Sequence, residues 1–161
     1  MPDDATRLPP ELAAALAGEG FRRRRRQVLL LATADPDGFP RIALLTLGEV
    51  RTASDTRLAV AVRARSRTAL NLVRRATATL LYLSRGVTVS VQARAGRGRV
   101  CRTDPLRRIF PLRVERVRID QPDPAEANVE LLTGPTFTGG GAASLFSEEL
   151  FAELGEAAAS G

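Results

Sequence analysis

Three arginines and two hydroxyl residues occupy a short stretch of the sequence where an expected strand gives way to an expected helix. Arg63, Arg65 and Arg67 stand beside Ser66 and Thr68. Backbone N–H groups are unpaired at the start of a helix, and guanidinium groups bind phosphate oxygens in pairs, so this combination is typical of a phosphomonoester site. The same residues also allow a simpler interpretation, in which the arginines are solvated and Ser66 only caps the helix.

Whole residue types are missing from the sequence, and their absence excludes many kinds of chemistry. The 161 residues include no His, no Trp and no Lys, so all 24 cationic residues are Arg. Without His there is no Ser/His/Asp relay and no histidine-ligated metal or haem, and without Lys there is no Schiff base or Walker phosphate loop. Cys101 is the single cysteine, which excludes an intramolecular disulfide and a cysteine metal cluster. The sequence predicts no metal site, and no residue stands out as a catalytic acid or base.

The overall composition is that of a folded protein. Hydrophobic residues make up 44% of the chain and charged residues 26%, which favours one folded domain over residues 1–161. No apolar run approaches the roughly 20 residues of a membrane helix, and the first residues lack the apolar segment of a signal peptide. We therefore expect a cytoplasmic protein without membrane contact.

The net charge of +6 is unevenly distributed along the chain. All arginines except Arg7 lie within residues 21–118, including an unbroken run at 22–26, whereas residues 119–161 contain acids and no arginine. A basic surface of this kind attracts nucleic acid, phosphorylated ligands or the chain's own acidic segment. We expect the acidic segment to pack across the basic middle of the chain.

Hydrophobic periodicity predicts a protein of mainly β structure with a few helices. The clearest strand spans residues 87–95, which alternate strictly between apolar and polar, and the alternation of 110–119 slips near Glu115, which predicts a bulge. Closure removes exposed strand edges, so this pattern favours an α+β fold with a small, closed or partly closed antiparallel barrel of six or seven strands. One helix is internal and one lies at each end. Strands are expected at 27–33, 41–47, 58–62, 79–83, 87–95, 110–119 and 128–137, and helices at 8–18, 66–75 and 144–154.

Two segments carry a resemblance to a known family. ATADPDGFPRIALLT at 32–46 is similar to a pattern of an Ala-Thr strand end, an acidic-Gly turn and a Pro before an R-x-V-L-L-K strand. RSRTALNLVRRATATLLYL at 65–83 is similar to an S-R-K helix start followed by a strand. In order and spacing they resemble the FMN-binding split barrels related to pyridoxamine 5'-phosphate oxidase. The resemblance covers residues 27–99, and more loosely extends to 138.

The resemblance implies a split-barrel domain that forms a homodimer and holds FMN at the subunit interface. Thr46 and Thr68 stand where the oxidases carry Lys, so a compensating role falls to Arg63 or Arg65. The implied cofactor contacts are Arg41, Ile42, Ala43, Leu44, Leu45 and Thr46 along the flavin and ribityl chain, Val62 and Arg63 at the next strand, Ser66, Arg67 and Thr68 at the phosphate, and Thr88 where the family often places Gln.

The substrate end of the chain departs from the oxidases. Their C-terminal signature combines Trp, Arg and His, and this chain lacks both Trp and His. The resemblance therefore implies an FMN-dependent oxidoreductase or flavin reductase of unknown small-molecule substrate, rather than a true pyridoxamine phosphate oxidase. Two alternatives stay open: a deazaflavin-binding reductase on the same fold, and a non-enzymatic, arginine-rich nucleic-acid binder. An aromatic content of 4% offers few stacking platforms for the latter.

Overall fold

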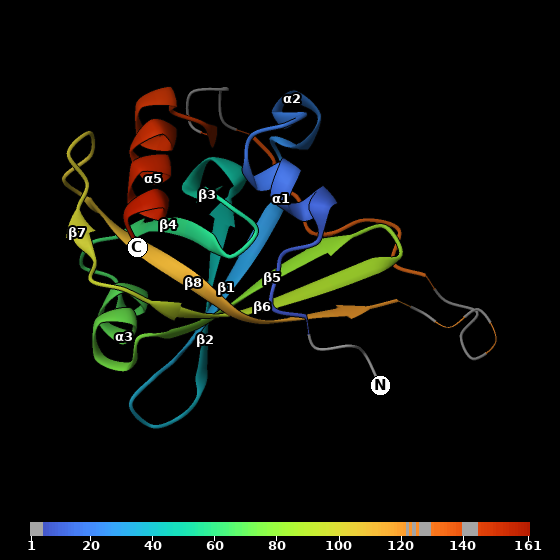
Figure 1. Cartoon of the computed structure of the whole chain (residues 1–161), viewed down its shortest axis with the longest axis horizontal. Coiled ribbons are helices and arrows are strands. Elements are labelled where there is room, and N and C mark those ends of the chain that lie inside the picture. The colour runs from blue at the N-terminus through green and yellow to red at the C-terminus, as the bar shows by residue number, and fades with distance from the viewer. Residues whose placement is uncertain (1–4, 122, 124, 126–129, 140–144) are drawn as a thin grey trace.

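A computed structural model describes residues 5–121, 123, 125, 130–139 and 145–161. The chain forms a curled antiparallel sheet with short helices packed around it (Figure 1). The helices are α1 (Pro10–Leu16), α2 (Phe21–Arg24), the 3-10 turn η1 (Leu47–Glu49), α3 (Arg67–Arg75) and α5 (Glu148–Ser160). The strands are β1 (Val28–Ala34), β2 (Pro40–Thr46), β3 (Val50–Thr52), β4 (Arg57–Arg63), β5 (Thr77–Ser84), β6 (Val87–Ala95), β7 (Arg99–Val100) and β8 (Arg107–Asp120).

The eight strands form one sheet in the order β2-β1-β5-β6-β8-β4-β3, with the short β7 paired to β8. Every pairing is antiparallel. Strands β2 and β3 are its two ends, and η1 connects them along the chain. The expected α+β fold with a small antiparallel split barrel is confirmed.

Alternation within single strands was a reliable guide to this sheet. In β6 the side chains of Val89, Val91 and Ala93 are buried, whereas Gln92 is exposed. The bulge expected near Glu115 is also present: Ala93 pairs with Val114 and Gln92 pairs with Arg116, so Glu115 has no partner in the β6–β8 register.

Strand β4 is buried on both faces. Leu58, Val60 and Val62 point into the main core, whereas Ala59 and Ala61 lie in a second cluster beneath α5. Small alanine side chains let the helix approach the sheet closely. Because both faces of β4 are buried, its sequence is continuously apolar and does not alternate between apolar and polar residues.

Two expected elements differ in the structure. Residues 130–137 do not form a strand, and residues 128 and 129 lie outside the described residues. Thr136 makes only a single bridge to Gln27, because Pro135 has no N–H to donate to a ladder. The C-terminal helix begins at Glu148 rather than at 144, which also lies outside the described residues. The Ser147 hydroxyl caps this helix by accepting the Leu150 N–H at 3.3 Å.

A buried carboxylate fixes α5 to the loop after β7. Glu153 is only 2% exposed. Its oxygens accept the backbone N–H of Arg102 at 2.8 Å and of Thr103 at 3.2 Å, and the thiol of Cys101 at 3.1 Å. Arg99 forms an ion pair with it. Burial opposes ionisation, but these hydrogen bonds outweigh it and hold the pKa of Glu153 well below its usual range.

The acidic C-terminal segment neutralises part of the basic middle, as expected from the charge distribution. Glu153 pairs with Arg99, Glu156 pairs with Arg102, and Glu130 pairs with Arg85 at 3.4 Å. Among the described helices, none is both long and apolar enough to cross a membrane.

Candidate functional site

The first turn of α3 presents hydrogen-bond donors that nothing in the described chain uses. Ser66 caps the helix, since its Oγ accepts the Ala69 N–H at 3.1 Å. Within residues that the structure describes, the backbone N–H groups of Arg67 and Thr68 meet no acceptor, and neither does the exposed Arg67 guanidinium. The Thr68 side chain itself is buried. Free N–H groups, a hydroxyl and a guanidinium at one helix start form an anion site, which we call the phosphate seat (Ser66–Thr68).

One side of the phosphate seat faces the hairpin between β1 and β2. Arg41 Nε donates to both carboxylate oxygens of Asp35 at 3.1 Å, and Asn71 Nδ2 donates to Asp35 Oδ1 at 2.8 Å. Asn71 also donates to Thr33 Oγ1 at 3.2 Å. Hydrogen bonds from Arg41 and then Asn71 lower the pKa of Asp35, and the charge of Arg67 adds to the effect. Asp35 thus joins α3 to the hairpin and interacts with both Arg41 and Arg67, the second of which belongs to the phosphate seat.

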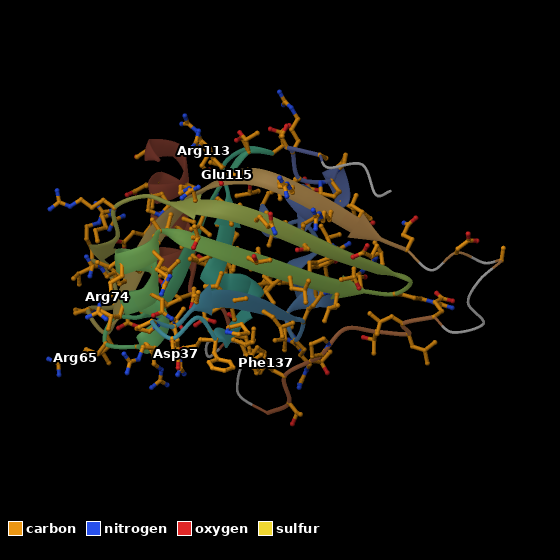
Figure 2. The ribbon with its side chains drawn as sticks, turned by 90° about the horizontal axis from the view of Figure 1, so that it is seen from below. Asp37, Arg65, Arg74, Arg113, Glu115 and Phe137 are labelled. Atoms are coloured by element: carbon orange, nitrogen blue, oxygen red, sulfur yellow. The ribbon has the colours of Figure 1, made fainter. Side chains whose placement is uncertain are left out.

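The other side of the phosphate seat faces the turn between β7 and β8. A cavity of about 620 Å³ lies there, which we call the arginine pocket. Arg63 lies directly opposite Arg107 in the β4–β8 ladder. Figure 2 shows Arg65 at the same end of the molecule as Arg74, which lies near the end of α3. The arginine pocket is lined by Arg63, Ala64, Arg65, Asp104, Pro105, Leu106 and Arg107.

Arg107 is held in place by two carboxylates. It forms ion pairs with Glu49 and with Asp104, the latter at 3.1 Å from Nε to Oδ2. Burial lowers the pKa of Arg107, but the hydrogen bonds to Glu49 and Asp104 outweigh burial and raise it overall. Arg107 therefore stays charged at the wall of the arginine pocket.

Strand β2 divides its predicted contact residues between two faces. Arg41, Ala43 and Leu45 share the inner face, where Leu45 is buried. Ile42 and Leu44 point outward and are 52% and 57% exposed. These two side chains form an apolar stripe on an end strand of the sheet.

Three residues that the resemblance implies as cofactor contacts away from the phosphate, Val62, Thr46 and Thr88, also lie away from the phosphate seat in the structure, and their contact with the flavin stays a prediction. Val62 is buried in the main core. Pairing across four strands places one residue of each strand side by side: Leu44, Leu30, Leu81 and Ser90. Thr46 and Thr88 each lie two residues farther along their strands, on the side away from Arg41. The Thr46 hydroxyl donates to Glu49 at 3.3 Å, so it serves the local cap of η1.

The structure therefore brings together Arg41, Ser66, Arg67 and Thr68, with Arg63 on the adjoining side. Three residues of the site were not singled out in the sequence: Asp35, Asn71 and Arg107. Asp35 has the sequence signal of a turn residue only. Asn71 was detectable in principle, because a buried Asn in the middle of a helix needs a polar partner.

The basic run Arg22–Arg26 lies away from this site. It precedes β1, whereas α3 contacts the far end of β1 through Thr33 (Figure 1). Seven residues of β1 separate the two regions, which is roughly 20 Å of strand. Within the described part of the chain, no group of three or more acidic or sulfur ligands is placed to hold a metal ion.

Comparison with known proteins identifies the family. The sequence profile described as pyridoxamine 5'-phosphate oxidase matches residues 10–132. The chain belongs to this family, and the resemblance in the sequence is confirmed. No curated protein sequence matches the chain.

Solved structures share the fold at low sequence identity. HupZ of Group A Streptococcus has a TM-score of 0.53 and 14% identity over 81% of this chain and 100% of its own. A putative pyridoxamine 5'-phosphate oxidase from Lactobacillus delbrueckii has a TM-score of 0.52 and 18% identity over 73% and 98%. An FMN-binding protein from Syntrophomonas wolfei has a TM-score of 0.52 and 12% identity over 68% and 86%. These likenesses concern the fold.

Proposed function

We propose that the protein binds FMN, with the cofactor's phosphate at the phosphate seat, and that it acts as an FMN-dependent oxidoreductase. The observation that carries the proposal is the first turn of α3, where two backbone N–H groups and the Arg67 guanidinium donate no hydrogen bond to a described residue and lie next to the Ser66 hydroxyl in the chain. Arg41 supplies a second cation on the hairpin side. The residues present therefore fit a phosphomonoester.

The flavin would supply the redox chemistry, and the chain would bind and orient it. The sequence contains neither Trp nor His, so we propose a substrate other than pyridoxamine phosphate. The proposal places the protein in the cytoplasm, in keeping with its single unpaired Cys101. A nucleic-acid binder is favoured less, because Arg22–Arg26 and α3 lie at opposite ends of β1.

Purified protein is expected to bind FMN saturably and to bind riboflavin more weakly, because riboflavin lacks the phosphate. Quenching of flavin fluorescence during titration measures both affinities. Adenosine monophosphate added at high concentration serves as a control for unspecific phosphate binding, and it should not displace FMN. Equal affinities for FMN and riboflavin would remove the phosphate seat from the proposal.

We further propose a homodimer that closes the flavin site between subunits. Ile42 and Leu44 expose an apolar stripe on an end strand, and such a stripe is typical of an interface. Sedimentation equilibrium at micromolar concentration should report about twice the 17.3 kDa of one chain.

The variant Leu44→Glu is expected to shift this equilibrium to the monomer, because it places a charge in the stripe. Val100→Glu is the matched control, since Val100 is 56% exposed but belongs to β7. A wild-type monomer that binds FMN tightly would contradict the dimer while leaving flavin binding intact.

A further inference from the structure

A cavity of about 520 Å³ lies between β7 and the last turn of α5 (Figure 1). None of the described residues that line it belongs to the phosphate seat, to the arginine pocket or to the implied cofactor contacts. We propose that this cavity binds a small apolar monocarboxylate, with the carboxylate group at Arg97. The proposal goes beyond flavin binding and does not depend on it. We call the cavity the β7–α5 pocket, and its walls include Arg97, Arg99, Val100, Arg102, Pro111 and Ala157.

The side chains at the β7–α5 pocket carry one positive charge in excess. Arg99 forms an ion pair with the buried Glu153, and Arg102 forms one with Glu156. The Arg97 side chain is exposed and makes no hydrogen bond or ion pair to any residue that the structure describes. Three arginines thus meet two carboxylates. A ligand with a single negative charge would balance the site.

A bulge in the sheet sets the position of Arg97. The pairings of β6 and β7 with β8 leave residues 96–98 opposite residues 110–111. Three residues on one side face two on the other, so the chain carries one residue more than the ladder can pair. A bulge of this kind re-aims a side chain. Arg97 is its central residue, and it lines the β7–α5 pocket.

The backbone on both sides of Arg97 is fixed before any ligand binds. The Gly96 N–H donates to the Pro111 carbonyl at 2.8 Å. The Gly98 carbonyl accepts a hydrogen bond from the Arg108 guanidinium at 3.1 Å. Both hydrogen bonds hold the bulge against β8. A preformed site loses little conformational freedom on binding.

The rest of the β7–α5 pocket suits an apolar ligand body. Val100 is 56% exposed, and Pro111 and Ala157 complete an apolar wall. The last turn of a helix carries negative partial charge, so an anion is favoured at Arg97 and disfavoured at the end of α5. The carboxylate of the ligand would therefore lie at Arg97, and its apolar part would extend toward α5. The volume lies within the usual range for small-molecule sites.

The test measures octanoate binding by NMR, from the shifts of the backbone amide signals of residues 97 and 100 during titration. Wild-type protein should bind octanoate more tightly than octanamide, which has the same chain without the charge. Arg97→Gln should weaken octanoate binding about tenfold or more, because it removes a charge-assisted contact, and it should leave octanamide binding unchanged. Val100→Ser should weaken both ligands, since both lose an apolar contact.

Arg23→Gln is the matched control. The Arg23 side chain is also exposed and has no partner among the described residues, but it lies on α2, so octanoate binding should not change. An equal loss in Arg23→Gln, or equal wild-type affinity for octanoate and octanamide, would overturn the proposal.

FMN separates this site from the phosphate seat. Saturating FMN should leave octanoate binding unchanged, whereas displacement of octanoate, or shifts confined to the first turn of α3, would place octanoate in the flavin site and overturn the proposal. Octanoate binding at residues 97 and 100 in a protein that does not bind FMN would refute the proposed function and support the β7–α5 pocket.

Discussion

Replacing Glu153 with alanine is expected to lower the free energy of unfolding by several kcal/mol, because each hydrogen-bond donor left unsatisfied in a buried place costs about 1–3 kcal/mol. The carboxylate is almost fully buried and accepts the N–H groups of Arg102 and Thr103. Without it, these donors and the Arg99 guanidinium lose their acceptor at the contact between α5 and β7. The loss should appear as a lower midpoint of urea denaturation.

Glu156→Ala is the matched control for this prediction. Glu156 lies on the same helix and pairs with Arg102, but its side chain is 60% exposed. Exposed ion pairs contribute about 0–1 kcal/mol, so this variant should be close to wild type. Equal destabilisation by the two substitutions would show that the buried network contributes nothing beyond surface charge pairing.

The same carboxylate predicts an acid-dependent loss of stability. Its pKa is lower in the folded protein than in the unfolded chain, so the unfolded chain binds the proton more tightly. The stabilisation from Glu153 is complete above the unfolded pKa of about 4.3 and declines as the pH falls below it. Urea midpoints of wild type and Glu153→Gln, compared from neutral to acid pH, should therefore converge at low pH. A constant difference would contradict the assignment.

Replacing Arg67 with alanine is expected to weaken FMN binding about tenfold to a hundredfold, because a charge-assisted hydrogen bond contributes about 1.5–3 kcal/mol. Riboflavin binding should stay unchanged, since riboflavin has no phosphate to contact. The comparison of the two flavins by fluorescence titration separates a phosphate contact from a general effect on the site.

Arg74→Ala controls for the loss of positive charge from α3. Arg74 is exposed near the other end of the same helix, and its replacement should leave both flavins unaffected. Equal weakening of FMN and riboflavin by Arg67→Ala would mean that Arg67 supports the ring or the fold. Unchanged FMN binding would remove it from the site.

Local patterns in the sequence were sufficient for most of the fold. Strict alternation identified β6, and the slip at Glu115 identified the bulge in β8, because side chains alternate with a period of two wherever one face of a strand is buried. The start of α3 was equally predictable, since Ser66 is a strong N-cap residue.

Contacts between distant segments were not predictable in the same way. Thr88 and Thr46 lie two residues beyond the register row of Leu44, away from Arg41, and this register depends on pairing across the whole sheet. Asp35 meets Asn71 only because α3 packs on the β1–β2 hairpin. Glu153 and Cys101 lie about fifty positions apart in the sequence, and no local pattern connects them.

The cover that α5 provides for β4 has a consequence for how the protein is made. β4 ends at Arg63 and α5 begins at Glu148, so at synthesis rates of about 5–20 residues per second the nascent chain waits roughly 4–17 s before the helix is available. During that interval Ala59 and Ala61 lack the α5 side chains that complete their cluster, although Cys101 and Ile109 are already present. Chaperones can therefore compete with folding for this face of β4 until α5 has been synthesised.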